Sequence, residues 1–128
     1  MDTELSILAL YGLVIVCTVL AQVLAAIPQV GLAALATARD DLGPLAGVAG
    51  RLERALKNSI VAMALFAPAV LLLNATTGFT PATLLAAQIF LVARIVYVFV
   101  YAAGIPWLRT LIWIAAFTAT IYLYLMAL

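Results

Sequence analysis

Long apolar stretches separated by short polar breaks make up most of this chain. No charged residue occurs in the stretch Leu5–Ala38 or in the stretch Ser59–Ala93. The second stretch is too long for one membrane-spanning helix, which takes about 20 residues. Within it, Gly78 is typical of a helix end, and Thr80-Pro81 is typical of an N-cap followed by proline at the first helical position.

A further break at Gly104-Ile105-Pro106 again combines a helix stop with a helix start. The pattern therefore predicts four helices, at about residues 4–36, 51–75, 81–103 and 106–127. The expected fold is all-α, an up-down-up-down bundle of four transmembrane helices that forms a single domain over residues 1–128.

Composition agrees with an integral membrane protein. The chain has 128 residues, of which 69% are hydrophobic and 9% are charged, and its mean hydropathy is +1.30. Soluble domains have about 45–50% apolar and about 25% charged residues. These values exclude a soluble globular domain and a disordered chain, and a single cysteine excludes a disulfide scaffold. Because 6 basic residues nearly balance 5 acidic ones, no basic surface for nucleic acid is expected.

The basic residues predict how the chain is oriented in the membrane. Those in or beside the two loops at one end of the predicted bundle are Arg39, Arg51, Arg54, Lys57 and Arg109. The other end, formed by both termini and the turn at 75–80, has no lysine or arginine. By the positive-inside rule, the two basic loops are cytoplasmic and both termini lie on the opposite side of the membrane.

Arg94 stands out because it lies inside the third predicted helix, eight or nine residues from its cytoplasmic end, or about 12 Å at the helical rise. Charged residues at such depth usually face the bundle interior or a wet cavity. Tyr97 and Tyr101 follow at i+3 and i+7 and share its face. Two alternatives stay open. Arg94 could extend along its stem to the interface, and the tyrosines could belong to an interfacial aromatic belt.

The second predicted helix begins with a similar polar stripe. Arg51, Arg54, Asn58 and Val61 follow at i, i+3, i+7 and i+10, and three of the four are polar. A basic helix start could simply mark the cytoplasmic interface, but this does not explain Asn58. Facing stripes of arginine, asparagine and tyrosine predict a binding site for an anion with several carboxylates.

Other chemistries are poorly supported by the residues present. The chain has no histidine and one cysteine, Cys17, so neither a metal site nor a Ser-His-Asp or Cys-His mechanism is expected. A small transporter or channel stays open as an alternative. A proton-coupled antiporter of the small four-helix multidrug type needs an acidic residue within its first span. Only Glu4, at the extreme end of the first predicted helix, is available there, which argues against proton coupling.

The polar motifs resemble those of one membrane family. The run RLERALKN at 51–58 resembles the R-x-x-R-A-x-x-N motif of the membrane-associated proteins in eicosanoid and glutathione metabolism (MAPEG). The run 93–101 followed by Arg109 resembles a second signature of that family, and Arg39-Asp40 is similar to small bacterial members. The resemblance covers nearly the whole chain and implies a homotrimer in a bacterial inner membrane, with glutathione bound between neighbouring subunits near the cytoplasmic face.

The resemblance also implies roles for individual residues. Arg109 would be catalytic and stabilise the glutathione thiolate, which would attack lipophilic electrophiles or hydroperoxides from the membrane. Arg39 would reach the site from an adjacent subunit. The residues that would bind glutathione are Arg51, Arg54, Asn58, Arg94, Tyr97 and Tyr101.

One position departs from the family motif. Val61 stands where the motif has a glutamate, the acid expected near the ammonium group of glutathione. Losing one charged hydrogen bond costs about 1.5–3 kcal/mol, or roughly ten- to 150-fold in affinity. A non-catalytic membrane protein of the same fold, binding another anionic or lipid ligand, is therefore an alternative to a glutathione-dependent transferase or peroxidase.

Overall fold

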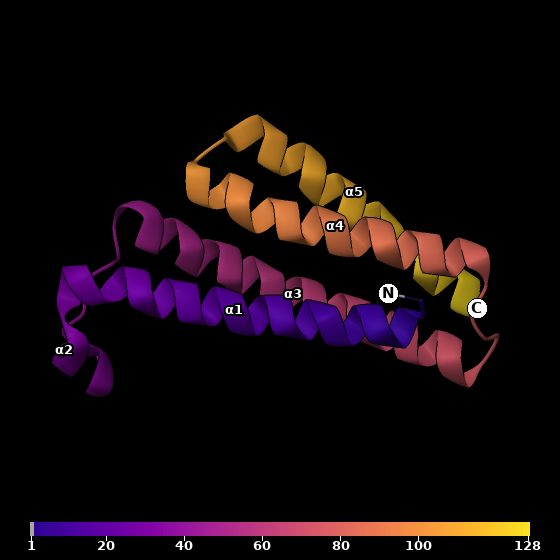
Figure 1. The fold of residues 1–128 in the computed structure, drawn as a ribbon, viewed down its shortest axis with the longest axis horizontal. Coiled ribbons are helices and arrows are strands. Elements are labelled where there is room, and N and C mark those ends of the chain that lie inside the picture. Colours follow the sequence, from indigo (N-terminus) through magenta and orange to yellow (C-terminus); the bar gives the residue numbers. More distant parts are fainter. Residues whose placement is uncertain (1) are drawn as a thin grey trace.

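The computed structural model describes residues 2–128, which form four long helices and one short one. Their bounds are α1 Glu4–Val30, α2 Leu32–Ala36, α3 Gly47–Ala75, α4 Pro81–Ala103 and α5 Pro106–Ala127. The four long helices run alternately up and down in one bundle (Figure 1). Each is long and apolar enough to cross a membrane. The predicted membrane four-helix bundle is confirmed.

Local sequence signals set the ends of the second hairpin. At the start of α4 the Thr80 side chain accepts from the Thr83 backbone and the Thr83 side chain accepts from the Thr80 backbone, with Pro81 in the first turn. Gly104 closes α4 in the left-handed conformation, at φ 77°, and Pro106 starts α5. These caps satisfy backbone groups that a helix end leaves unpaired. Both helices begin and end where the sequence pattern predicts.

The first two helices differ from the prediction. The helix expected over 4–36 ends at Val30, because Gly31 at φ 82° interrupts it and α2 follows as a separate short helix. The second helix begins at Gly47 and not at residue 51. Its start is held by Gln29 of α1, whose side chain donates to the Ala46 carbonyl oxygen at 2.7 Å and accepts from the Ala46 amide at 3.0 Å. This tertiary contact could not be read from local pattern.

Three aromatic rings form the centre of the core. Phe66 of α3 and Phe90 of α4 stack with their centroids 3.8 Å apart. The ring of Tyr11 from α1 meets Phe66 and Phe90 edge-on, at 6.4 and 4.9 Å. All three side chains are buried. The packing fixes how α1, α3 and α4 are rotated relative to one another, and therefore which polar side chains point inward.

The two ends of the bundle differ in charge. The termini and the α3–α4 turn lie at one end, and the loop at 37–46 and the α4–α5 connection lie at the other (Figure 1). We call the latter the basic end, because five of the 6 lysines and arginines lie there. Arg94 is the sixth and lies within the bundle. Toward the basic end the α4–α5 hairpin diverges from α1 (Figure 1), whereas the end of α4 stays in contact with Arg51 at the start of α3.

Candidate anion-binding site

Arg94 points into the bundle interior and not toward lipid. Its side chain is 1% exposed. Its Nε donates to the Tyr11 hydroxyl at 3.1 Å, and its Nη2 donates to Asn58 Oδ1 at 2.9 Å and to Ser59 Oγ at 3.2 Å. The guanidinium also lies over the Tyr97 ring, 4.3 Å from the centroid. Of the two orientations considered from sequence, the interior one is the one observed.

Tyr11 and Ser59 belong to this network, although the sequence analysis did not single them out. The Tyr11 hydroxyl donates to the Ser59 carbonyl oxygen at 2.9 Å while it accepts from Arg94. Both residues are fully buried. The sequence did contain a signal for Tyr11, because a phenol inside an otherwise apolar span needs a hydrogen-bond partner. The hydrogen-bond partners of Arg94 among residues 2–128 are all uncharged.

A pocket of about 340 Å³ lies next to this network, between α3, α4 and α5. We call it the polar pocket. Its lining residues are Arg54, Asn58, Tyr97, Tyr101, Arg109, Thr110 and Trp113. The Arg109 guanidinium lies over the Tyr101 ring, 4.4 Å from the centroid. The described lining includes two guanidinium groups, two phenols and an amide but no carboxylate, so it suits an anion.

Most of the predicted site residues meet here. Five of them line the polar pocket directly, and Arg94 lies beside it, in contact with two of the lining side chains, Asn58 and Tyr97. The stripes predicted on the second and third spans therefore converge, and the start of α5 completes the pocket. Convergence of cations from separate helices is what binding a polyvalent anion inside a membrane requires.

Two predicted residues lie elsewhere. The Nε of Arg51 donates to the Ala102 carbonyl oxygen at 2.8 Å, so this side chain ties the start of α3 to the end of α4. Arg39 is exposed beyond α2, where its Nε donates to the Leu35 carbonyl oxygen at 2.9 Å. Each arginine satisfies a carbonyl group near the end of a helix, which is a favourable place for a cation.

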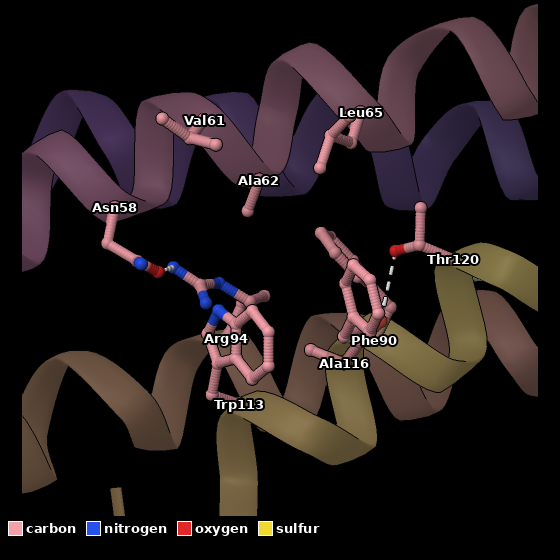
Figure 2. Close-up of a pocket in the computed structure, with 10 residues that line it drawn as sticks. Asn58, Val61, Ala62, Leu65, Phe90, Arg94, Trp113, Ala116 and Thr120 are labelled. Atoms are coloured by element: carbon pink, nitrogen blue, oxygen red, sulfur yellow. Dashed lines mark hydrogen bonds between the residues drawn. The ribbon is translucent and has the colours of Figure 1, made fainter. Parts of the chain in front are cut away.

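A second space continues from the polar pocket toward the bundle centre. It has a volume of about 120 Å³, lies between α3, α4 and α5, and shares Asn58 and Trp113 with the polar pocket. We call it the apolar cavity. Figure 2 shows Asn58 pointing toward Arg94, with Trp113 beside Arg94 and Phe90 deeper in. A polar space and an apolar space therefore adjoin at these shared residues.

Val61 lies on the rim of the apolar cavity and does not line the polar pocket. Its side chain is 59% exposed. In Figure 2 it points away from Arg94, whereas Asn58, one turn earlier on α3, points toward it. The position at which the family motif has an acid is thus on the outer side of α3 in this subunit.

Comparison with known proteins agrees with these features. The chain matches the MAPEG family over residues 5–128, which include all four long helices and every residue of the polar pocket. It has no significant match among curated proteins or among solved structures. Many members of the matched family bind glutathione. Four apolar spans, the converging arginine and tyrosine stripes and this match over nearly the whole length lead to one conclusion: the chain belongs to the MAPEG family of membrane proteins.

Proposed function

We propose that this protein is a membrane-bound, glutathione-dependent transferase or peroxidase that acts on lipophilic electrophiles. The observation that carries the proposal is the junction of the polar pocket with the apolar cavity. A charged tripeptide needs a polar pocket and an apolar co-substrate needs an apolar one. Here the two adjoin, because Asn58 and Trp113 line both. Family membership adds that many relatives bind glutathione.

In the proposed complex, the residues of the polar pocket hold the anionic tripeptide. The exposed guanidinium of Arg54 binds a carboxylate at the pocket mouth. Tyr97 and Tyr101 provide phenol donors, and Asn58 provides its amide nitrogen because its Oδ1 already accepts from Arg94. Arg94 lies beside the polar pocket and does not line it. Its hydrogen bond holds Asn58 in place, and its charge favours an anion in the pocket.

Arg109 is proposed to stabilise the thiolate. Lowering a thiol pKa from about 8.5 to about 6.5 requires about 2.7 kcal/mol of preference for the anion. A guanidinium about 4 Å from sulfur supplies on the order of 4 kcal/mol at an effective dielectric constant of 20. The thiol proton passes to water. The thiolate then attacks the electrophilic carbon, so a carbon–sulfur bond forms while the leaving group departs with its electron pair.

We further propose a homotrimer with the basic end in the cytoplasm. The polar pocket is open in a single subunit, and Arg54 is exposed there. A neighbouring subunit would cover that opening, and Arg39 of that neighbour, exposed beyond α2, would approach the bound tripeptide. A cytoplasmic basic end places the pocket mouth where soluble glutathione is available.

The proposal is tested by isothermal titration of the detergent-solubilised protein with glutathione, together with conjugation of 1-chloro-2,4-dinitrobenzene. We expect saturable binding at or below millimolar concentration. Arg109→Ala should lower turnover at pH 7 by about 25-fold, because a return of the thiol pKa from about 6.5 to about 8.5 lowers the thiolate fraction from about three quarters to about 3%. Lys57→Ala is the matched control, because Lys57 is a basic-end cation that is 72% exposed and pairs with Glu53 outside the pocket. The proposal would be rejected if titration with glutathione gave no heat of binding, or if Arg109→Ala and the wild type had equal turnover.

A second function is favoured by the side chains that line the polar pocket. No carboxylate is found among the described residues that line the polar pocket, so nothing in one subunit pairs with the ammonium group of glutathione. A ligand with an anionic head and no ammonium group would not need that partner. The second candidate is therefore a non-catalytic MAPEG protein that binds such an anionic or lipid ligand. Binding of a fatty-acid carboxylate without any binding of glutathione would favour it.

A further inference from the structure

We propose that a pocket at the basic end, separate from the polar pocket, binds the headgroup of an anionic phospholipid. The pocket has a volume of about 390 Å³ and lies between α1, α3 and the segment at 35–45 that connects them. We call it the loop pocket. Its polar lining residues are Gln22, Arg39, Glu53 and Lys57. It shares no lining residue with the polar pocket, so the inference does not depend on the proposed function.

The loop pocket lies at the boundary between the hydrocarbon core and the headgroups. α1 has 27 residues, or about 40 Å, and so exceeds a hydrocarbon core of about 30 Å by about 10 Å. With the start of α1 at the outer boundary, about seven residues at its other end reach the headgroup layer on the basic side (Figure 1). Gln22 directly precedes this part of α1. Glu53 lies at the same level, because α1 and α3 are antiparallel and Gln29 contacts Ala46.

Gln22 has an amide that no residue of the described chain satisfies. It lies within an otherwise apolar span and is half-buried. Gln29, two turns later, has both amide atoms paired with the Ala46 backbone, whereas the Gln22 side chain makes no hydrogen bond within residues 2–128. Polar groups at membrane depth are costly unless they are hydrogen-bonded. The ester carbonyl oxygens of a phospholipid lie just below its phosphate and would accept from the Gln22 amide.

Arg39 has an uncommon backbone conformation. Within residues 2–128 it is the one non-glycine residue with a positive φ, 65°. Side chains other than hydrogen disfavour this conformation, and such strain is concentrated at binding sites. The Arg39 Nε donates to the Leu35 carbonyl oxygen, and the two Nη groups make no hydrogen bond within the described chain. A guanidinium with two free Nη groups suits the oxygens of a phosphate.

The charges of the loop pocket indicate a ligand with one net negative charge. Arg39 and Lys57 are cations, and Glu53, 3.4 Å from the Lys57 ammonium, is the one acid in the described lining. Asp40 and Asp41 are exposed in the same loop but do not line the pocket. The phosphate of phosphatidylglycerol would accept from Arg39 and Lys57, and a hydroxyl of its headgroup would donate to Glu53. Phosphatidylethanolamine has no net charge and would leave one cation uncompensated.

The site is tested by native mass spectrometry of the delipidated protein in detergent. The probes are phosphatidylglycerol, phosphatidylethanolamine and phosphatidylcholine with identical acyl chains, so that only the headgroup differs. We expect one phosphatidylglycerol per subunit to bind about fivefold more tightly than either of the other two lipids, from the difference of one charge.

Two substitutions remove separate parts of the pocket. Gln22→Leu removes the amide from an apolar span and should weaken phosphatidylglycerol binding about two- to tenfold. Lys57→Gln removes an exposed cation and should weaken it about fivefold. Arg54→Gln is the matched control, because Arg54 is also an exposed cation of α3 but lines the polar pocket instead, and it should leave the affinity unchanged. Arg39 is not substituted, because the proposed trimer also uses it.

Each outcome decides the proposal. Weaker binding in Gln22→Leu and Lys57→Gln, but not in Arg54→Gln, would support the loop pocket. Equal affinity for the three lipids, or undiminished binding in the Gln22→Leu/Lys57→Gln double variant, would overturn it. Equal losses in Lys57→Gln and Arg54→Gln with none in Gln22→Leu would show a general attraction to the basic end, and a loss in Arg54→Gln alone would place the lipid in the polar pocket. Both results overturn the proposal.

The two proposals fail separately. Gln22 and Lys57 lie outside the polar pocket, so neither substitution should change the heat of glutathione binding. Selective binding of phosphatidylglycerol without any binding of glutathione would support the loop pocket and overturn the glutathione-dependent function. Glutathione binding without selectivity among the lipids would do the reverse.

Discussion

At the residue scale, the unusual feature is a buried guanidinium whose hydrogen-bond partners in the described chain are neutral. Arg94 is held by a phenol, an amide and a hydroxyl, and an aromatic ring lies under it. Removing one partner of a buried charge usually costs more than removing a neutral pair. Each hydrogen bond to Arg94 is therefore strongly favoured, and the bond to Asn58 fixes the orientation of that amide. Because none of these partners carries a negative charge, an anion in the polar pocket would neutralise the guanidinium.

Tyr11→Phe tests the network, because it removes the hydroxyl that accepts from Arg94 and donates to the Ser59 carbonyl oxygen. We expect a loss of about 1.5–3 kcal/mol in unfolding free energy, the range for hydrogen bonds to charged groups. Glutathione affinity should also fall, because Arg94 then holds Asn58 less firmly. Unfolding in SDS and glutathione titration measure the two effects.

Tyr124→Phe is the matched control for this prediction. The Tyr124 hydroxyl of α5 also donates to a carbonyl oxygen of α3, that of Leu65 at 2.7 Å, but it does not contact Arg94. This variant should lose about 0.5–1.5 kcal/mol and keep its glutathione affinity. Equal losses of affinity in the two variants would mean that Tyr11 has only a general packing role.

At the element scale, the helix ends explain which spans could be located from the sequence. The ends of α4 and α5 depend on proline, glycine and threonine caps, which are local signals. The interruption of the first helix comes from the positive φ of Gly31, a residue within an otherwise apolar stretch. The early start of α3 is held by the contact between Gln29 and Ala46, which are 17 residues apart. A charge-free stretch therefore locates a span but does not show where its helix bends away.

Gly31→Ala should destabilise the junction between α1 and α2. Gly31 has φ 82°, a conformation that is unfavourable for a residue with Cβ, so we expect a cost of about 1–2 kcal/mol. Gly43→Ala is the control, because Gly43 has no positive φ and a Cβ there would meet no atom within 4 Å. Unfolding in SDS compares the two variants, and equal stabilities would show that the break is not set by Gly31.

At the scale of the whole molecule, the asymmetry of charge predicts the orientation. Both termini lie at the end of the bundle opposite to the basic end (Figure 1). Translocating five cations would be unfavourable, so we expect the basic end to stay in the cytoplasm. The polar pocket lies on the basic side of Arg94, which is consistent with a water-soluble ligand that enters from that side.

The orientation is tested by labelling single cysteines in intact cells with a membrane-impermeant maleimide. In a Cys17→Ser background, Leu128→Cys at the exposed C-terminus should be labelled from outside. Asp41→Cys, in the exposed loop at the basic end, should be labelled only after lysis. The reverse pattern would place the basic end outside and would remove the argument for cytoplasmic glutathione.

The sequence alone determined the number of spans, the end at which the basic residues gather and the polar stripes on α3 and α4. These properties depend on length, hydropathy and the helical repeat, which are local. Tertiary structure decided that Arg94 and Asn58 meet, that Tyr11 joins them from α1, and that Arg51 turns instead to the end of α4. It also decided that α5 forms one wall of the apolar cavity beside them. The physical reason is that the helical repeat fixes which residues share a face, whereas only the packing of one helix on another fixes where that face points.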